Sequence, residues 1–109
     1  MSQRLQRLQQ LLEATPNDAF ALFAIAKEYE GLQDTAQALD FYLRLRNIDP
    51  SYVGLYYHLG KLYVKTGNLA DALQTYREGM NVAKSAGDMH AFSELNAARL
   101  EIDDSEDDY

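Results

Sequence analysis

The feature that most constrains this chain is a pattern of apolar, small and aromatic residues that occurs twice. The second copy follows the first at a fixed interval, as from Tyr29 to Tyr63. Within each copy the marked residues follow one another at spacings of mostly three and four, which is typical of helices, and the interval is typical of helix–turn–helix repeats. The first copy consists of Leu22, Ile25, Ala26, Tyr29, Ala38 and Tyr42, and the second of Tyr56, Leu59, Gly60, Tyr63, Ala72 and Tyr76.

The residues that end helices keep the same period. Pro16 and Pro50 are separated by this same interval, and proline disfavours helix at the residue before it. Lys84 stands at the third such position, so the helix there is expected to run a turn longer than its counterpart. The predicted helices are 2–14, about 18–30, 34–47, about 52–65, 69–85 and about 88–103.

The turns between these helices carry side chains that suit helix ends. Asn17 or Asp18 is expected to cap the second helix, and Asp34 with Gln37 predicts a capping box at the start of the third. Gly67 is expected to take the left-handed conformation and Asn68 to cap the fifth helix.

The period divides the chain into complete and partial copies of one repeat. Residues 2–16 match the second half of a repeat, and residues about 19–52 and 53–86 are full repeats. Residues 88–102 form a capping helix that matches the repeat pattern poorly. We therefore predict a single domain over 1–102. Residues 103–109 form an acidic tail that is expected to be disordered and solubilising.

Composition excludes several classes of protein. The chain has no cysteine, which excludes disulfides, thiolate zinc sites and cysteine nucleophiles. Its longest apolar run, 19–26, is far too short to span a membrane. Residues 101–109 hold six of the 17 acidic residues and no base, which leaves 11 acids against 10 bases elsewhere. Because no basic stripe is present, nucleic-acid binding is not expected. No signal sequence precedes the repeats, so the cytoplasm is the expected location.

The repeated residues resemble the tetratricopeptide repeat (TPR) family. The resemblance covers 19–86 and implies an all-α, right-handed α-solenoid of antiparallel helix pairs, here with about six helices in a small stand-alone domain. The chain departs from the family pattern at Gln33, where glycine is common, at Gly79, where alanine is usual, and at Lys84, where proline is usual.

The resemblance also implies a function, which is the binding of a protein or peptide in the groove lined by the first helix of each repeat. The groove positions are Phe20, Phe23, Lys27, Tyr57, His58, Lys61 and Val64. The last helix is expected to add Ala91, Leu95 and Ala98. Lys27 and Lys61 stand one period apart, so an acidic peptide with an apolar anchor is the expected ligand. In the alternative, Phe20 and Phe23 pack on the first helix and the lysines are solvated.

Catalytic and metal-binding motifs are absent from the sequence. His58 and His90 are out of phase with the repeat, and neither belongs to a known metal or nucleophile motif. We therefore expect no enzyme activity, no metal and no cofactor.

Two alternatives concern the ends of the chain. In the first, the protein is a self-assembling scaffold, a homodimer or larger, that pairs through its terminal helices. In the second, the acidic tail binds the lysine face, and deletion of 103–109 then raises the affinity for a peptide ligand.

Overall fold

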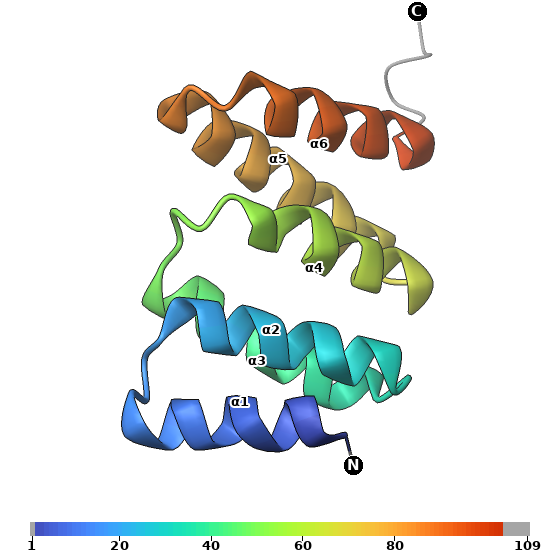
Figure 1. The fold of residues 1–109 in the computed structure, drawn as a ribbon. Helices are drawn as coiled ribbons and strands as arrows, with labels where there is room; N and C mark the ends of the chain where they lie inside the picture. The colour runs from blue at the N-terminus through green and yellow to red at the C-terminus, as the bar shows by residue number, and fades with distance from the viewer. Residues whose placement is uncertain (1, 104–109) are drawn as a thin grey trace, which may run out of the picture. The chain divides into compact units, whose positions relative to one another are not determined.

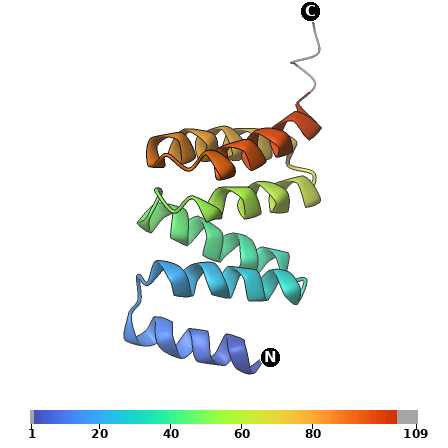
Figure 2. The ribbon, with the colours of Figure 1, turned by 45° about the horizontal axis from the view of Figure 1, so that its top comes forward.

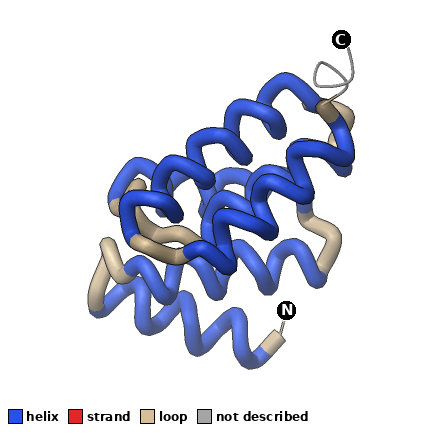
Figure 3. The backbone as a smooth tube through the Cα atoms, turned by 90° about the horizontal axis from the view of Figure 1, so that it is seen from above, coloured by secondary structure: helices blue, strands red, loops and turns tan. Residues whose placement is uncertain are grey.

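The computed structural model describes residues 2–103, which form two compact units that divide between Pro50 and Ser51. Unit 1 contains α1 (Gln3–Ala14), α2 (Ala19–Gly31) and α3 (Thr35–Ile48), and unit 2 contains α4 (Gly54–Lys65), α5 (Leu69–Ala86) and α6 (Met89–Ile102) (Figure 1). The part of the chain that the structure describes is all helix and turn, with no strand (Figure 3). The prediction of six helices in an all-α fold is confirmed.

In unit 1 the apolar stripe of α1 packs on α2, and α2 pairs with α3. Leu5 and Leu8 form a buried cluster with Ala24 and Ile25, against which Leu12, Tyr29 and Phe41 pack. The rings of Tyr29 and Phe41 stack with centroids 5.7 Å apart. Burial of this apolar surface is the main favourable contribution to the stability of the unit.

In unit 2 the three helices alternate in direction, and α5 packs on both α4 and α6 (Figure 2). Two glycines fit two tyrosine rings across the α4–α5 contact. A Cβ atom on Gly60 of α4 would overlap the ring of Tyr76 of α5, and a Cβ atom on Gly79 of α5 would overlap the side chain of Tyr56 of α4. Each helix therefore supplies both a tyrosine and the space for its partner's tyrosine.

Most of the predicted helix ends are confirmed. The side chains of Ser2, Asp18, Asp34 and Asp88 accept hydrogen bonds from backbone N–H groups in the first turns of α1, α2, α3 and α6. Gly67 has φ 82°. The helix α5 has 18 residues against 14 in α3, which agrees with the longer helix expected where Lys84 replaces proline.

One capping prediction is confirmed only in half, and one is wrong. The capping box at Asp34 is half formed, because its backbone N–H donates to Tyr29 O at 2.9 Å and not to Gln37. Asn68 makes no side-chain cap for α5, since its amide Nδ2 donates to Thr66 Oγ1 at 2.9 Å.

Gln33 occupies the left-handed region that glycine normally takes. Its φ is 59°, and Gly67, which stands one period later, has φ 82°. Left-handed backbone costs a non-glycine residue about 1–2 kcal/mol, partly offset in a glycine variant by its greater freedom when unfolded. Gln33→Gly is therefore expected to raise the free energy of unfolding by about 1 kcal/mol, as measured by urea denaturation. The matched control, Gly67→Gln, is expected to lower it, and a loss of stability in Gln33→Gly would contradict this account.

Asp103 differs from the sequence-based expectation of a solvated tail residue. It ends α6 and its side chain is 4% exposed. Arg77 Nη2 and Arg99 Nη1 each donate to Asp103 Oδ2 at 2.9 Å. The first residue of the predicted tail is thus part of the folded unit, and the remainder, 104–109, lies outside the described residues.

Candidate functional site

A pocket in unit 2 lies between α4 and α6 and has a volume of about 300 Å³. Its lining is mixed, with apolar side chains, an imidazole, a phenol and one carboxylate. The lining residues are Val53, Gly54, Tyr57, His58, Ala91, Glu94 and Leu95. Such a small hollow, apolar with a few polar groups, can receive one side chain of a bound segment.

Helix spacing explains how α4 supplies three parts of this lining. Gly54, Tyr57 and His58 are separated by three and four residues, so they lie on one face of the helix. The rings of Tyr57 and His58 meet edge to face, with centroids 5.7 Å apart. On α6, Ala91, Glu94 and Leu95 have the same spacing and complete the pocket.

Lys61 lies beside this pocket and makes two weak interactions. Its Nζ is 5.6 Å from the centre of the Tyr57 ring and 3.9 Å from Glu101 Oε2. Both Lys61 and Glu101 are exposed, and exposed ion pairs of this kind add little to stability. The ammonium group can therefore exchange Glu101 for a carboxylate of a ligand at small cost.

The three predicted groove residues of unit 1 have different environments. Phe20 is 58% exposed, so it is not packed away on α1. Phe23 is half-buried, and its ring lies 6.2 Å from the ring of Tyr42 in α3. Lys27 is exposed. Lys27 belongs to unit 1 and Lys61 to unit 2, and their position on one common face stays a prediction.

Sequence reasoning identified part of the unit 2 pocket. Tyr57 and His58 line it, whereas Val64 is half-buried and lies elsewhere on α4. Val53, Gly54 and Glu94 were missed. Val53 and Gly54 stand one turn before Tyr57 and His58, a spacing that could have identified them. Glu94 stands one period after Gly60, at a position that belongs to the repeated pattern and not to the groove.

Tyr42 and Tyr76 are buried in the two helix pairs. Burial raises the pKa of Tyr42 well above its usual value, and the hydrogen bond to the Glu30 carboxylate and its negative charge raise it further. Burial raises the pKa of Tyr76 to about 12, with smaller contributions from Tyr57 and Glu101. Both phenols are neutral at physiological pH, which fits a role in packing.

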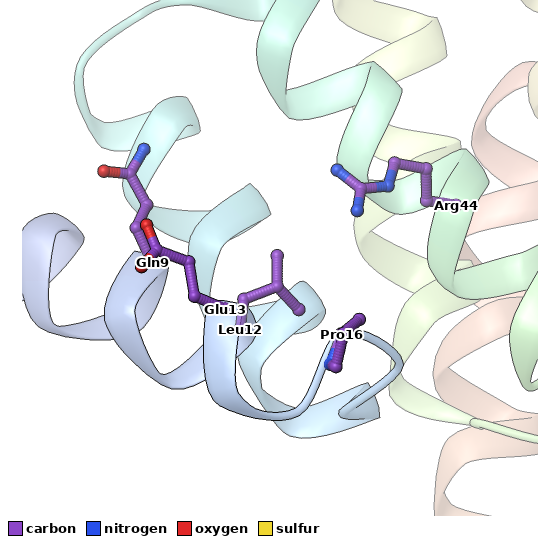
Figure 4. A pocket seen from close by; sticks show the side chains of 5 residues that line it. All are labelled: Gln9, Leu12, Glu13, Pro16 and Arg44. Carbon is purple, nitrogen blue, oxygen red and sulfur yellow. The ribbon is translucent and has the colours of Figure 1, made fainter.

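A second cavity lies in unit 1, between α1 and α3, with a volume of about 410 Å³. Figure 4 shows the guanidinium of Arg44 on one side and Leu12 and Pro16 on the other; Gln9 and Glu13 complete the lining. The Arg44 guanidinium also lies 4.6 Å from the centre of the Phe41 ring. None of the predicted groove residues lines this cavity.

Residues 2–103 contain neither a metal-binding cluster nor a membrane-spanning helix. No cluster of three or more histidine and acidic side chains in this range could hold a metal ion. No helix in this range is both long and apolar enough to cross a membrane.

The comparisons with known proteins agree with this geometry. The family model that matches residues 53–85 is described as the tetratricopeptide repeat. A tetratricopeptide repeat domain protein from Salinibacter ruber is 40% identical, with a TM-score of 0.75, over 78% of this chain and 94% of that one. A Bordetella parapertussis protein is 25% identical, with a TM-score of 0.80, over 94% and 89% of the two chains. The TPR repeat-containing protein PA0015 of Pseudomonas aeruginosa is 27% identical over 91% of this chain and 94% of that one.

The helix pairs and the comparisons together define an α-solenoid protein of the class that binds other proteins. The chain belongs to the tetratricopeptide repeat family. Domains of this family bind proteins or peptides and are generally not catalytic.

Proposed function

We propose that this chain binds a peptide segment of a partner protein and that the α4–α6 pocket of unit 2 receives an apolar or aromatic side chain of that segment. The observation that carries the proposal is the lining of the pocket, in which Ala91 and Leu95 face Tyr57 and His58. Aromatic and apolar anchors in pockets dominate the affinity of most peptide complexes.

The second part of the proposal concerns charge. Lys61 stands next to the pocket and pairs with the exposed Glu101 at 3.9 Å. A carboxylate of the ligand replaces Glu101 as its partner, so the bound segment carries an acidic residue close to its apolar anchor. Phe20 and Lys27 are proposed as further binding residues of unit 1.

The proposed function is binding without catalysis. The alternative of a self-assembling scaffold, the absence of nucleic-acid ligands and a cytoplasmic location stay predictions. The observation that favours peptide binding over self-assembly is the shape and chemistry of the α4–α6 pocket.

The pocket is tested by filling it. Peptides are first selected against the whole chain from a random display library, and their affinity is measured by titration calorimetry. Ala91→Leu places three further carbon atoms at the pocket wall and is expected to weaken the selected peptides at least about tenfold, or about 1.4 kcal/mol. Ala97→Leu is the matched control, because Ala97 is on the same helix and does not line the pocket.

The charge is tested by Lys61→Glu, with Lys65→Glu as a control of the same charge change on the exposed end of α4. Acidic peptides are expected to lose affinity in the first variant only, and more so at low salt. If the selected peptides bind Ala91→Leu with the affinity of the wild type, the pocket does not receive their anchor. Equal effects of the two lysine variants would remove the role of Lys61.

A further inference from the structure

A different hollow of unit 2 lies between α5 and α6, with a volume of about 390 Å³. It is lined by Arg77, Met80, Asn81, Lys84 and Phe92, so it is basic and polar on one side and apolar on the other. Arg77, Asn81 and Lys84 follow at four and three residues and share one face of α5. Among residues 2–103 no acidic side chain lines this groove, and its chemistry suits an anionic segment that carries an apolar or aromatic group.

One carboxylate already binds at the rim of this groove. Arg77 lines the groove, and its guanidinium donates to Asp103 at 2.9 Å. Arg99 donates to the same carboxylate oxygen at 2.9 Å, and the Asp103 side chain is 4% exposed. The described part of the chain thus ends in contact with the groove, at the first of a series of acidic residues.

The residues that follow have the composition that the groove suits. Residues 104–109 contain four acids and end with an aromatic side chain, in the order Asp104, Ser105, Glu106, Asp107, Asp108 and Tyr109. They lie outside the described residues. We propose that this segment binds in the α5–α6 groove of its own chain, with its carboxylates beside Arg77 and Lys84 and its aromatic ring beside Met80 and Phe92.

The length of the segment is sufficient. Arg77 and Lys84 are two turns of helix apart, or about 10 Å along the axis. Six extended residues reach about 20 Å, so a segment that starts at Asp103 can pass Lys84. Because its start is already fixed, binding loses less entropy than it would for a free peptide. The α4–α6 pocket, which has no residue in common with this groove, stays accessible to a ligand.

The proposal is tested by paramagnetic relaxation in the full chain. The chain has no cysteine, so Asp108→Cys gives a single site for a spin label and keeps Tyr109. The label is expected to remove most of the amide signal intensity of Asn81, Lys84 and Phe92 at low salt. The intensity should return at about 1 M salt, where the screening length is about 3 Å.

The matched charge variants decide between a specific and a general effect. Lys84→Glu in the labelled chain is expected to restore the signals of Asn81 and Phe92, whereas Lys65→Glu, an exposed position outside the groove, is expected to leave the broadening unchanged. A second reporter is the Met80 methyl signal, which should shift when Asp104, Glu106, Asp107 and Asp108 are all replaced by their amides.

Three results would overturn the proposal. The first is broadening confined to the residues beside Asp103, and the second is broadening around Lys61 instead of Lys84, which would support the lysine face. The third is broadening in a mixture of labelled chain with isotope-enriched, unlabelled chain, which would assign the groove to the segment of a second copy. None of these measurements uses a peptide ligand, so the outcome is independent of the α4–α6 pocket.

Discussion

Replacing Gly79 by alanine is expected to lower the free energy of unfolding by about 2 kcal/mol, although alanine is the better helix former. A Cβ atom on Gly79 would overlap Tyr56 Cβ and would lie 2.9 Å from Tyr56 Cγ and 3.1 Å from Leu95 Cδ1. Because the Tyr56 Cβ is fixed to the backbone of α4, the two helices have to separate. Overpacking of about 3 kcal/mol exceeds the gain in helix propensity of about 1 kcal/mol.

Urea denaturation and thermal unfolding measure this loss. For a domain of this size it corresponds to a fall in Tm of about 10 °C. Gly31→Ala is the matched control, since a Cβ atom on Gly31 meets nothing within 4 Å, and it is expected to leave stability unchanged or slightly raised. A Gly79→Ala protein as stable as the wild type would show that α4 and α5 pack differently.

Replacing Asp103 by asparagine is expected to lower the free energy of unfolding by about 2–3 kcal/mol. The substitution keeps the shape of the side chain but removes the charge that two guanidinium groups share. The Arg99 side chain is only 13% exposed, so a largely buried guanidinium would lose the carboxylate of Asp103. The amide oxygen of Asn96, which accepts from Arg99 Nη2 at 2.9 Å, is neutral and cannot replace that charge.

A variant of Arg77, the more exposed of the two arginines, is the control for Asp103→Asn. Arg77 is 55% exposed, so water and salt screen its pair with Asp103. Arg77→Gln is therefore expected to lose far less stability than Asp103→Asn, and denaturation of both variants at low and high salt measures the difference. Equal losses would mean that Arg99 does not depend on Asp103, contrary to the geometry of the cluster.

The helices could be predicted from the sequence because their signals are local. Turn residues such as Pro16 and Gly67 act within a few positions, and the periodic burial of apolar residues repeats with each copy of the pattern. The missing half of the Asp34 capping box and the missing Asn68 cap have an equally local reason. Asp34 and Asn68 each had a competing hydrogen-bond partner, Tyr29 O and Thr66 Oγ1, that spacing does not reveal.

The packing of Gly79 could not be predicted, because it depends on a residue of another helix. The sequence shows only a departure from alanine at this position. The structure shows that the space is occupied by Tyr56, and the residues one period earlier, Leu22 and Leu45, are two buried side chains of middle size. The second repeat thus has a large and a small residue where the first repeat has two middle-sized ones.

The candidate site was predictable only in part, with Ala91 and Leu95 of α6 expected besides the residues of α4. Tyr57 and His58 follow from the register of the repeat, whereas Glu94 depends on how α6 lies against α4. Asp103 likewise reads as one more acid in an acidic run. Its burial follows from the two arginines, Arg77 and Arg99, that reach it from α5 and α6.

The fit of the Tyr76 ring against Gly60 has a kinetic consequence. A buried aromatic ring can rotate by half a turn only when its surroundings expand briefly, and here the expansion requires α4 and α5 to part. The flip of the Tyr76 ring should therefore be slow, because the edge of this ring lies against Gly60. The paired ring resonances of Tyr76 should then coalesce only on warming, and their exchange rate reports how often α4 and α5 separate.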